Sequence, residues 1–164
     1  MQDQQAEMER LARRVRELEK QRDALASRQE PSAAAFADLL TDQVRVLGPD
    51  HPDTLTTRSN LAHFRGQAGD SAGAAAAFAD LLTDQVRVLG PDHPDTLTTR
   101  SNLAHFRGQA GDSAGAAAAF ADLLTDQVRV LGPDHPDTLT TRSNLAQWQM
   151  EAAHRREGEA SVDA

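Results

Sequence analysis

The chain has no cysteine, no tyrosine and only one tryptophan. Without cysteine there is no disulfide, no thiol nucleophile and no cysteine-ligated zinc. Only 4% of the residues are aromatic, so leucine, alanine, valine and a few phenylalanines must fill the core. No apolar run approaches the ~20 residues of a membrane span, and the N-terminus has no apolar signal-peptide segment. These absences favour a cytoplasmic protein.

Positive charge is also scarce, since the formal net charge is −8. The first 32 residues hold seven acidic and seven basic residues, so the acidic excess lies after them. An acidic surface repels a phosphate backbone, which argues against a nucleic-acid partner. An anionic membrane surface is disfavoured for the same reason.

What the chain does have is a repeat without substitutions. Residue i is identical to residue i+42 for every i from Ala33 to Ala104, so residues 33–146 repeat one unit. This period is typical of stacked-repeat proteins, in which each unit buries its apolar face only against its neighbours. The absence of drift fits either a recent gene duplication or an engineered array. Because every group recurs, the tract has no copy-specific catalytic site, which argues against an enzyme.

The first half of each unit is predicted to be a helix. In the copy that begins at His51, Pro52 suits the first helical position, and Asp50 or His51 would be the N-cap. The helix covers residues 54–68 and ends at Gly69, which we expect in the left-handed conformation. Its inward residues are predicted from their spacing: Leu55, Leu61, Ala62, Phe64 and Ala68.

The second half of the unit is predicted to be another helix, capped by Asp70 or Ser71. Gly90 and Pro91 end it, because proline cannot continue a helix. No strand is indicated. The inward residues of this helix are predicted as Ala74, Phe78, Leu81, Leu82, Val86 and Leu89, with Phe78 and Phe120 in the cores of neighbouring units.

The tract begins and ends within a unit. Ala33–Leu47 is a second-type helix without its sequence-matched partner, and Pro136–Ala146 begins a first-type helix. The Gly-Gln-Ala-Gly stop is lost there, so this helix should continue to about Arg156. We therefore expect an N-terminal charged helix at 1–30, a repeat array at 31–156 and a disordered tail at 157–164.

The N-terminal helix carries a heptad pattern with Arg22 at one a position. One interpretation is a parallel homodimer, in which Arg14 at g meets Glu19 at e of the partner. The other is a cap, in which the apolar stripe packs on the helix at 33–47. The residues of the stripe are Met8, Leu11, Val15, Leu18 and Leu25.

The helix pair resembles the tetratricopeptide repeat at its small and apolar positions. The 42-residue period resembles that of the kinesin-light-chain-type subclass, and the amino-acid sequence of the unit is most similar to actinobacterial members. The resemblance implies an all-α fold, a short right-handed α-solenoid of antiparallel helix pairs with about seven helices. Arg65 stands where the family usually has a large apolar group. The matching residues are Asn60-Leu61-Ala62, Gly69 and Ala74-x3-Phe78.

The resemblance also implies a binding surface, because these arrays bind extended peptides or partner proteins on the concave wall lined by the first helices. The asparagines would form a ladder, and an amide can pair with both groups of a peptide backbone. The alternative is that they bond neighbouring helices and bind nothing. Carried over by position, the wall comprises Thr56, Ser59, Asn60, His63, Gln67, Thr98, Ser101, Asn102, His105, Gln109, Thr140, Ser143, Asn144 and Gln147.

The histidines give only a weak metal signal. His63 and His105 could ligate a metal between first helices, but two histidines without a carboxylate are more typical of solvated side chains. His51, His93 and His135 stand at helix starts, where capping is favoured over a metal site. We predict no metal and no cofactor.

Two functions remain open from the sequence. The first is a non-catalytic scaffold that binds a protein or an extended peptide along the concave wall. The second is a structural or self-assembly element that oligomerises through the N-terminal heptads. The sequence names neither the ligand nor the pathway.

Overall fold

The computed structural model describes residues 33–162 of the chain, and six helices and no strand occur in that range. The all-α fold is therefore confirmed, with a helix number near the predicted seven. None of the described helices is both long and apolar enough to cross a membrane. The predicted helix at 1–30, with its heptad residues, lies outside the described residues. The helices are α2 (Ala33–Leu47), α3 (Pro52–Gln67), α4 (Ser71–Val88), α5 (Pro94–Gln109), α6 (Ser113–Val130) and α7 (Pro136–Val162).

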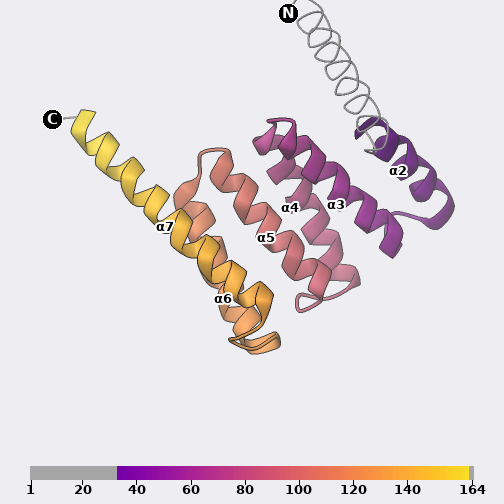
Figure 1. Cartoon of the computed structure of the whole chain (residues 1–164). Coiled ribbons are helices and arrows are strands. Elements are labelled where there is room, and N and C mark those ends of the chain that lie inside the picture. Colours follow the sequence, from indigo (N-terminus) through magenta and orange to yellow (C-terminus); the bar gives the residue numbers. More distant parts are fainter. Residues whose placement is uncertain (1–32, 163–164) are drawn as a thin grey trace, which may run out of the picture. The chain divides into compact units, whose positions relative to one another are not determined.

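Phe36–Ala164 forms the second of the two units into which the chain divides. Within the second unit each helix from α3 to α7 packs on the next one, and α3 also contacts α5. In Figure 1 the first helices α3, α5 and α7 lie side by side, with the second helices α4 and α6 behind them. The first helices thus share one face of this unit.

Side-chain caps and glycines set the helix ends, as the sequence predicts. Nδ1 of His51 accepts a hydrogen bond from the Asp53 N–H at 3.2 Å, and the equivalent histidines of the other copies do the same. Asp70 caps α4, where its carboxylate accepts from the Gly73 N–H at 2.9 Å. Gly69 follows α3 with a φ of +96°, the left-handed conformation that glycine adopts without a Cβ penalty. The histidines at the helix starts are therefore caps.

An aromatic ring from the following unit completes the core of each full unit. Phe78 is fully buried, and the Phe106 ring of α5 stacks on it with centroids 5.7 Å apart and an interplanar angle of 11°. Phe120 is also fully buried, and Trp148 of α7 joins its cluster. The predicted core positions of Phe78 and Phe120 are confirmed. Each unit is thus stabilised by its neighbour.

Glycine makes this ring insertion possible. A Cβ on Gly66, inside α3, would overlap the Phe106 ring, and a Cβ on Gly108 would crowd the Trp148 ring. Successive first helices therefore approach closely at these two positions. Glycine in a helix interior costs roughly 0.5–1 kcal/mol relative to alanine, and the packed ring offsets that cost.

Two residues that the sequence predicted as inward are exposed. Ala68 is the C-cap of α3, beyond its last turn. Val86 lies beside the buried stripe of α4, and Gln85 is buried in its place. Phe78, Leu81 and Gln85 follow the i, i+3, i+7 spacing of a single helix face, and Val86 is one residue off it.

The last helix also differs from its prediction. α7 runs to Val162, past the predicted end near Arg156, so residues 157–162 of the expected disordered tail are helical. No proline follows Arg156, and a single helical glycine such as Gly158 costs only about 1 kcal/mol relative to alanine. The proposed division of the chain at residues 30 and 156 otherwise stays a prediction.

Candidate functional site

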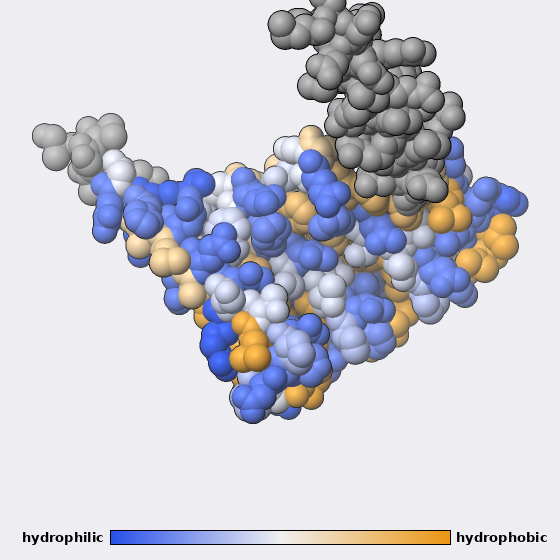
Figure 2. Space-filling model, viewed as in Figure 1, coloured by the Kyte–Doolittle hydropathy of each residue, from blue (hydrophilic) through white to orange (hydrophobic). Residues whose placement is uncertain are grey.

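The fourteen residues predicted to form the wall all lie on α3, α5 and α7, and none of them is buried. Figure 2 shows that the face formed by these helices is largely hydrophilic. Threonine, serine and asparagine side chains supply hydroxyl and amide groups there. This face therefore offers hydrogen bonds more than apolar contact.

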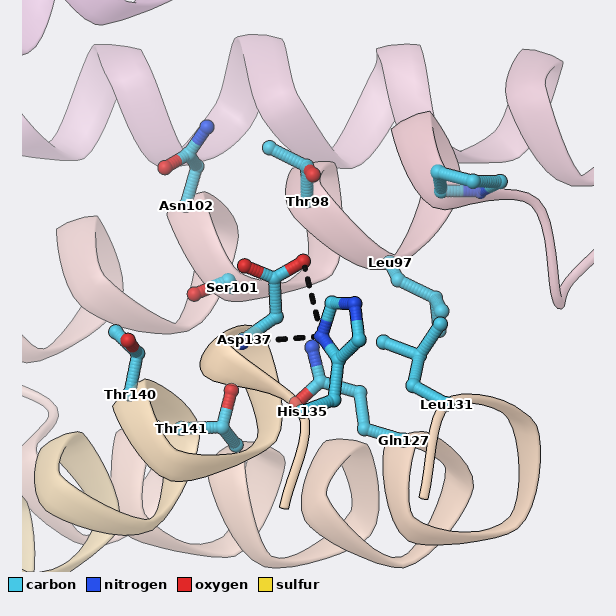
Figure 3. A pocket seen from close by; sticks show the side chains of 11 residues that line it. Leu97, Thr98, Ser101, Asn102, Gln127, Leu131, His135, Asp137, Thr140 and Thr141 are labelled. Carbon is cyan, nitrogen blue, oxygen red and sulfur yellow. Dashed lines mark hydrogen bonds and ion pairs between the residues drawn. The ribbon is translucent and has the colours of Figure 1, made fainter. Parts of the chain in front are cut away.

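A hollow of about 310 Å³ lies between α5 and α7 (Figure 3). Thr98, Ser101 and Asn102 of α5 line it together with Thr140 of α7, all of which were predicted as wall residues. Its volume is at the lower end of the range for small-molecule sites. It can accept part of an extended chain, such as one side chain with its backbone.

A second hollow of about 90 Å³ repeats this arrangement one unit earlier, between α3 and α5. Its lining includes Thr56, Ser59 and Asn60, which are the copies of Thr98, Ser101 and Asn102. The two hollows together contain seven of the fourteen predicted residues. The same polar surface thus occurs twice, displaced by one repeat.

Each hollow also contains a buried glutamine that sequence reasoning missed. Gln85 lines the smaller hollow and Gln127 the larger one, and both side chains are only 3% exposed. The Oε1 atom of each is buried without a hydrogen-bond partner among the described residues. A buried polar group normally has a partner, because leaving it unpaired costs about 1–3 kcal/mol. Helical spacing from Phe78 and Leu81 was the signal that could have placed Gln85 inside.

The asparagines at the two hollows have side chains without hydrogen-bond partners among the described residues. Asn60 and Asn102 make no side-chain hydrogen bond within the part of the chain that the structure describes. Among the described residues, therefore, neither asparagine bonds a neighbouring helix. Asn144, the third member of the ladder, lines neither hollow.

Each hollow holds a carboxylate that no arginine neutralises. Asp137 lines the larger hollow and Asp95 the smaller, and neither pairs with an arginine among the described residues. The arginines of α3 and α5 are engaged elsewhere, Arg58 with Asp84 and Arg100 with Asp126, each at 2.7 Å. The hollows are therefore acidic.

The arginine pairs behind this face are shared. Arg58 and Arg87 both donate to Asp84, and these hydrogen bonds hold the pKa of its carboxyl below the usual value. Arg87 also donates to Asp50, whose pKa is lowered for the same reason. The pattern links α3, α4 and the loop before α3. It joins these helices, and no arginine or lysine lines either hollow.

The wall histidines lie apart from the hollows and pack on rings. His63 and His105 both meet the Phe106 ring edge-on, with centroids 5.9 and 5.3 Å away. Burial lowers the pKa of His105, and the nearby His63 lowers it further. No group of three or more metal-ligating side chains occurs among the described residues.

The remaining predicted wall residues do not come together in one site. Gln67 bonds His63 at 3.1 Å, and the Ser71 hydroxyl donates to Gln109 at 3.3 Å. The others lie on α7 outside both hollows: Ser143, Asn144 and Gln147.

The stacked helix pairs, with a polar face on the first helices, define a helical-repeat protein. The sequence profile of the tetratricopeptide repeat family matches residues 54–95 and 96–137, about half of the chain. The chain therefore belongs to the tetratricopeptide repeat family. Repeats of this family generally mediate protein–protein interaction or scaffolding.

Solved structures of similar fold are kinesin-light-chain-like. A Podosopora anserina kinesin light chain protein with nearly identical TPR-like repeats superposes with a TM-score of 0.68 at 21% identity, covering 90% of this chain and 66% of that one. BtubC (BKLC) from P. vanneervenii superposes with a TM-score of 0.68 at 20% identity, covering 84% of this chain and 55% of that one. This chain thus spans less than two thirds of either neighbour. No curated protein sequence matches it significantly.

Proposed function

We propose that the chain is a non-catalytic scaffold that binds an extended peptide, or an extended segment of a protein, across α3, α5 and α7. The observation that carries this proposal is the hollow that recurs at two successive junctions. Each copy combines a free asparagine at its rim with a buried glutamine whose oxygen has no partner. Family membership supports the class of function.

An extended segment fits the spacing of the two hollows better than a compact ligand does. One ligand that reaches both hollows must cross α5, which lies between them. A peptide backbone offers N–H and C=O groups at regular intervals, and asparagine and glutamine amides can pair with both kinds of group. A ligand N–H that reaches the unpaired oxygen would relieve the cost of its burial.

The ligand is expected to be cationic. Asp95 and Asp137 are not neutralised by arginine, and the net charge of the chain is −8. A lysine or arginine side chain brings donors and no acceptor, which suits an unpaired Oε1. It also suits a carboxylate whose one ion-pair partner among the described residues is a histidine 3.8 Å away. Attraction between exposed charges is screened beyond ~10 Å at 0.1 M salt, so binding should weaken as salt rises.

An array of identical units offers no place for a unique nucleophile–base pair, so we propose no catalysis and no cofactor. The acidic surface argues against nucleic acid and anionic membranes as partners. The absence of cysteine favours a cytoplasmic location. Dimerisation through the N-terminal heptads stays an alternative role.

The first test uses peptides selected from a random library on the immobilised full-length chain. Binding of the selected peptide is then measured by fluorescence anisotropy for the wild type, Asn102→Ala and Asn144→Ala. Asn102 lines the larger hollow, whereas Asn144 is the same residue type on α7 and lines neither hollow. We expect Asn102→Ala to weaken binding about tenfold, because the hydrogen bonds of one amide are lost. Asn144→Ala should leave binding unchanged.

Two outcomes would count against the proposal. One is a library that yields no peptide whose binding saturates. The other is a peptide that binds equally well to Asn102→Ala and to wild type, which would place the binding surface elsewhere.

A further inference from the structure

The described array has half a unit at each end. α2 is a second-type helix, and no repeat-matched first helix precedes it in sequence. α7 is a first-type helix, and it continues through Ala153, the position equivalent to Gly111, where the previous unit turns. Residues 155–162, which would begin a second helix, are part of α7 itself. The two ends therefore carry complementary halves of the same unit.

The apolar surfaces of these halves match. In the complete unit Leu97 of α5 and Leu123 of α6 share one core cluster, with exposures of 2% and 0%. Their copies at the ends are Leu139 of α7, which is 47% exposed, and Leu39 of α2, which is 45% exposed. Val44, Val46 and Leu47 of the same helix are also exposed, and Figure 2 shows hydrophobic surface at α2. Each end thus exposes one member of a leucine pair that is buried wherever the unit is complete.

The charges of the two halves match in the same way. In the complete unit Arg100 bonds Asp126 at 2.7 Å. Arg142, the copy of the arginine, makes no ion pair with any described residue. Asp42, the copy of the aspartate, pairs among the described residues only with the exposed Arg45.

A second ion pair of the complete units also has its two partners separated at the ends of the array. Arg129 of α6 bonds Asp92, in the loop before α5, at 2.6 Å. The copies of these residues are Arg45 of α2 and Asp134, in the loop before α7, and Asp134 has no ion pair among the described residues. Both ends therefore lack the charge that the other end supplies.

We propose that chains associate head to tail, with α7 of one copy docking on α2 of the next. The junction would reproduce the interior of a complete unit, pairing Leu139 with Leu39, Arg142 with Asp42 and Asp134 with Arg45 across the two copies. The occupant of each end is another copy of this chain, because residues 33–47 and 136–146 are identical to helices that already pack on each other inside it. Such a contact joins two different surfaces, so further copies can add in the same way until the assembly closes into a ring or continues as an open chain.

Met150 limits the strength of this junction. It stands at the position of Gly66 and Gly108, where the ring from the following first helix inserts. In a head-to-tail junction that ring is Phe64 of the next copy, and a methionine side chain occupies the space that glycine leaves open. The ring must shift, so we expect association to be weak and reversible. Met150→Gly should strengthen it.

Sedimentation velocity of the full chain across a concentration series tests the proposal. The wild type should show a weight-average sedimentation coefficient that rises with concentration. Leu39→Glu blocks the α2 end and Leu139→Glu blocks the α7 end, and each should raise the dissociation constant about tenfold or more. Both leucines are already half exposed, so circular dichroism should report unchanged helicity.

A mixture of the two blocked variants distinguishes this geometry from others. Each variant keeps one intact end, so an equimolar mixture should form one-to-one pairs that stop growing. A wild-type chain that stays monomeric at every concentration would overturn the proposal, whether or not the N-terminal segment covers α2. A dimer that survives both Leu39→Glu and Leu139→Glu would also overturn it and would assign assembly to the heptads.

Discussion

At the scale of single residues, Gln85 and Gln127 stand out because they occupy positions that a stable core would give to an apolar side chain. Each lies on the buried stripe of its helix and leaves its Oε1 unpaired. Local rules of packing are broken most often at functional sites. Both line the hollows, and the proposed role of the hollows in ligand binding would explain this departure.

We predict that Gln127→Met separates stability from binding. Methionine has nearly the same shape and removes an unpaired polar group, so the melting temperature should stay the same or rise. Binding of the selected peptide should weaken, because the amide on the floor is lost. Gln43→Met is the matched control, since Gln43 also has an unpaired Oε1 but lines neither hollow. A lower melting temperature with unchanged binding would make Gln127 purely structural.

The fully buried phenylalanines should dominate stability. Phe78→Ala is expected to cost ~3–5 kcal/mol of unfolding free energy, out of a total of ~5–15 kcal/mol. Phe36→Ala removes the same ring from the incomplete unit, where it is only partly buried, and should cost less. Urea unfolding of the two variants measures both costs. Equal losses would show that burial in a complete unit does not matter.

At the scale of helices, much of the fold could be predicted from the sequence. The helix ends could be predicted from Pro52, His51 and Gly69, because capping and the left-handed conformation depend on local chemistry. The repeat period then fixed the order of the helices. The family resemblance predicted fourteen wall residues, and seven of them line the hollows. What failed depended on contacts between elements: the burial of Gln85, the exposure of Val86 and the length of α7.

The close approach of first helices predicts opposite effects for two Gly→Ala changes. Alanine favours a helix over glycine by roughly 1 kcal/mol. At Gly66 a Cβ would overlap the Phe106 ring, so overpacking should make Gly66→Ala destabilising by ~1–3 kcal/mol. At Gly158 a Cβ meets open space, so Gly158→Ala should be neutral or slightly stabilising. Thermal melts compare them, and a stabilising Gly66→Ala would contradict the ring insertion.

At the scale of the whole molecule, stability comes from a succession of equivalent junctions. Each one combines a ring inserted beside a glycine with arginine–aspartate pairs that join neighbouring helices. Exposed pairs of this kind contribute little individually, but the same pairs recur from unit to unit. Each unit thus depends on its neighbours along the chain. The proposed head-to-tail junction would bury the half-units at the two ends in the same way.

These pairs predict how stability depends on pH. Hydrogen bonds from arginines lower the pKa of Asp84 and Asp126 below the usual 3.8. The unfolded chain therefore binds protons first, so the pairs stabilise the fold above about pH 4, and this stabilisation is lost as the pH falls through the lowered values. Circular dichroism during acid titration should show unfolding in that range. Asp84→Asn should lower stability at pH 7 and flatten the acid transition; an unchanged transition would contradict this role.

The measurement that tests the binding site most directly is nuclear magnetic resonance of the side-chain amides during titration with the selected peptide. The amides of Asn60, Asn102, Gln85 and Gln127 line the two hollows, and Asn144 serves as the internal reference. We predict that the four hollow amides shift together and saturate while the Asn144 amide stays in place. Saturating shifts confined to residues outside the hollows would contradict the account.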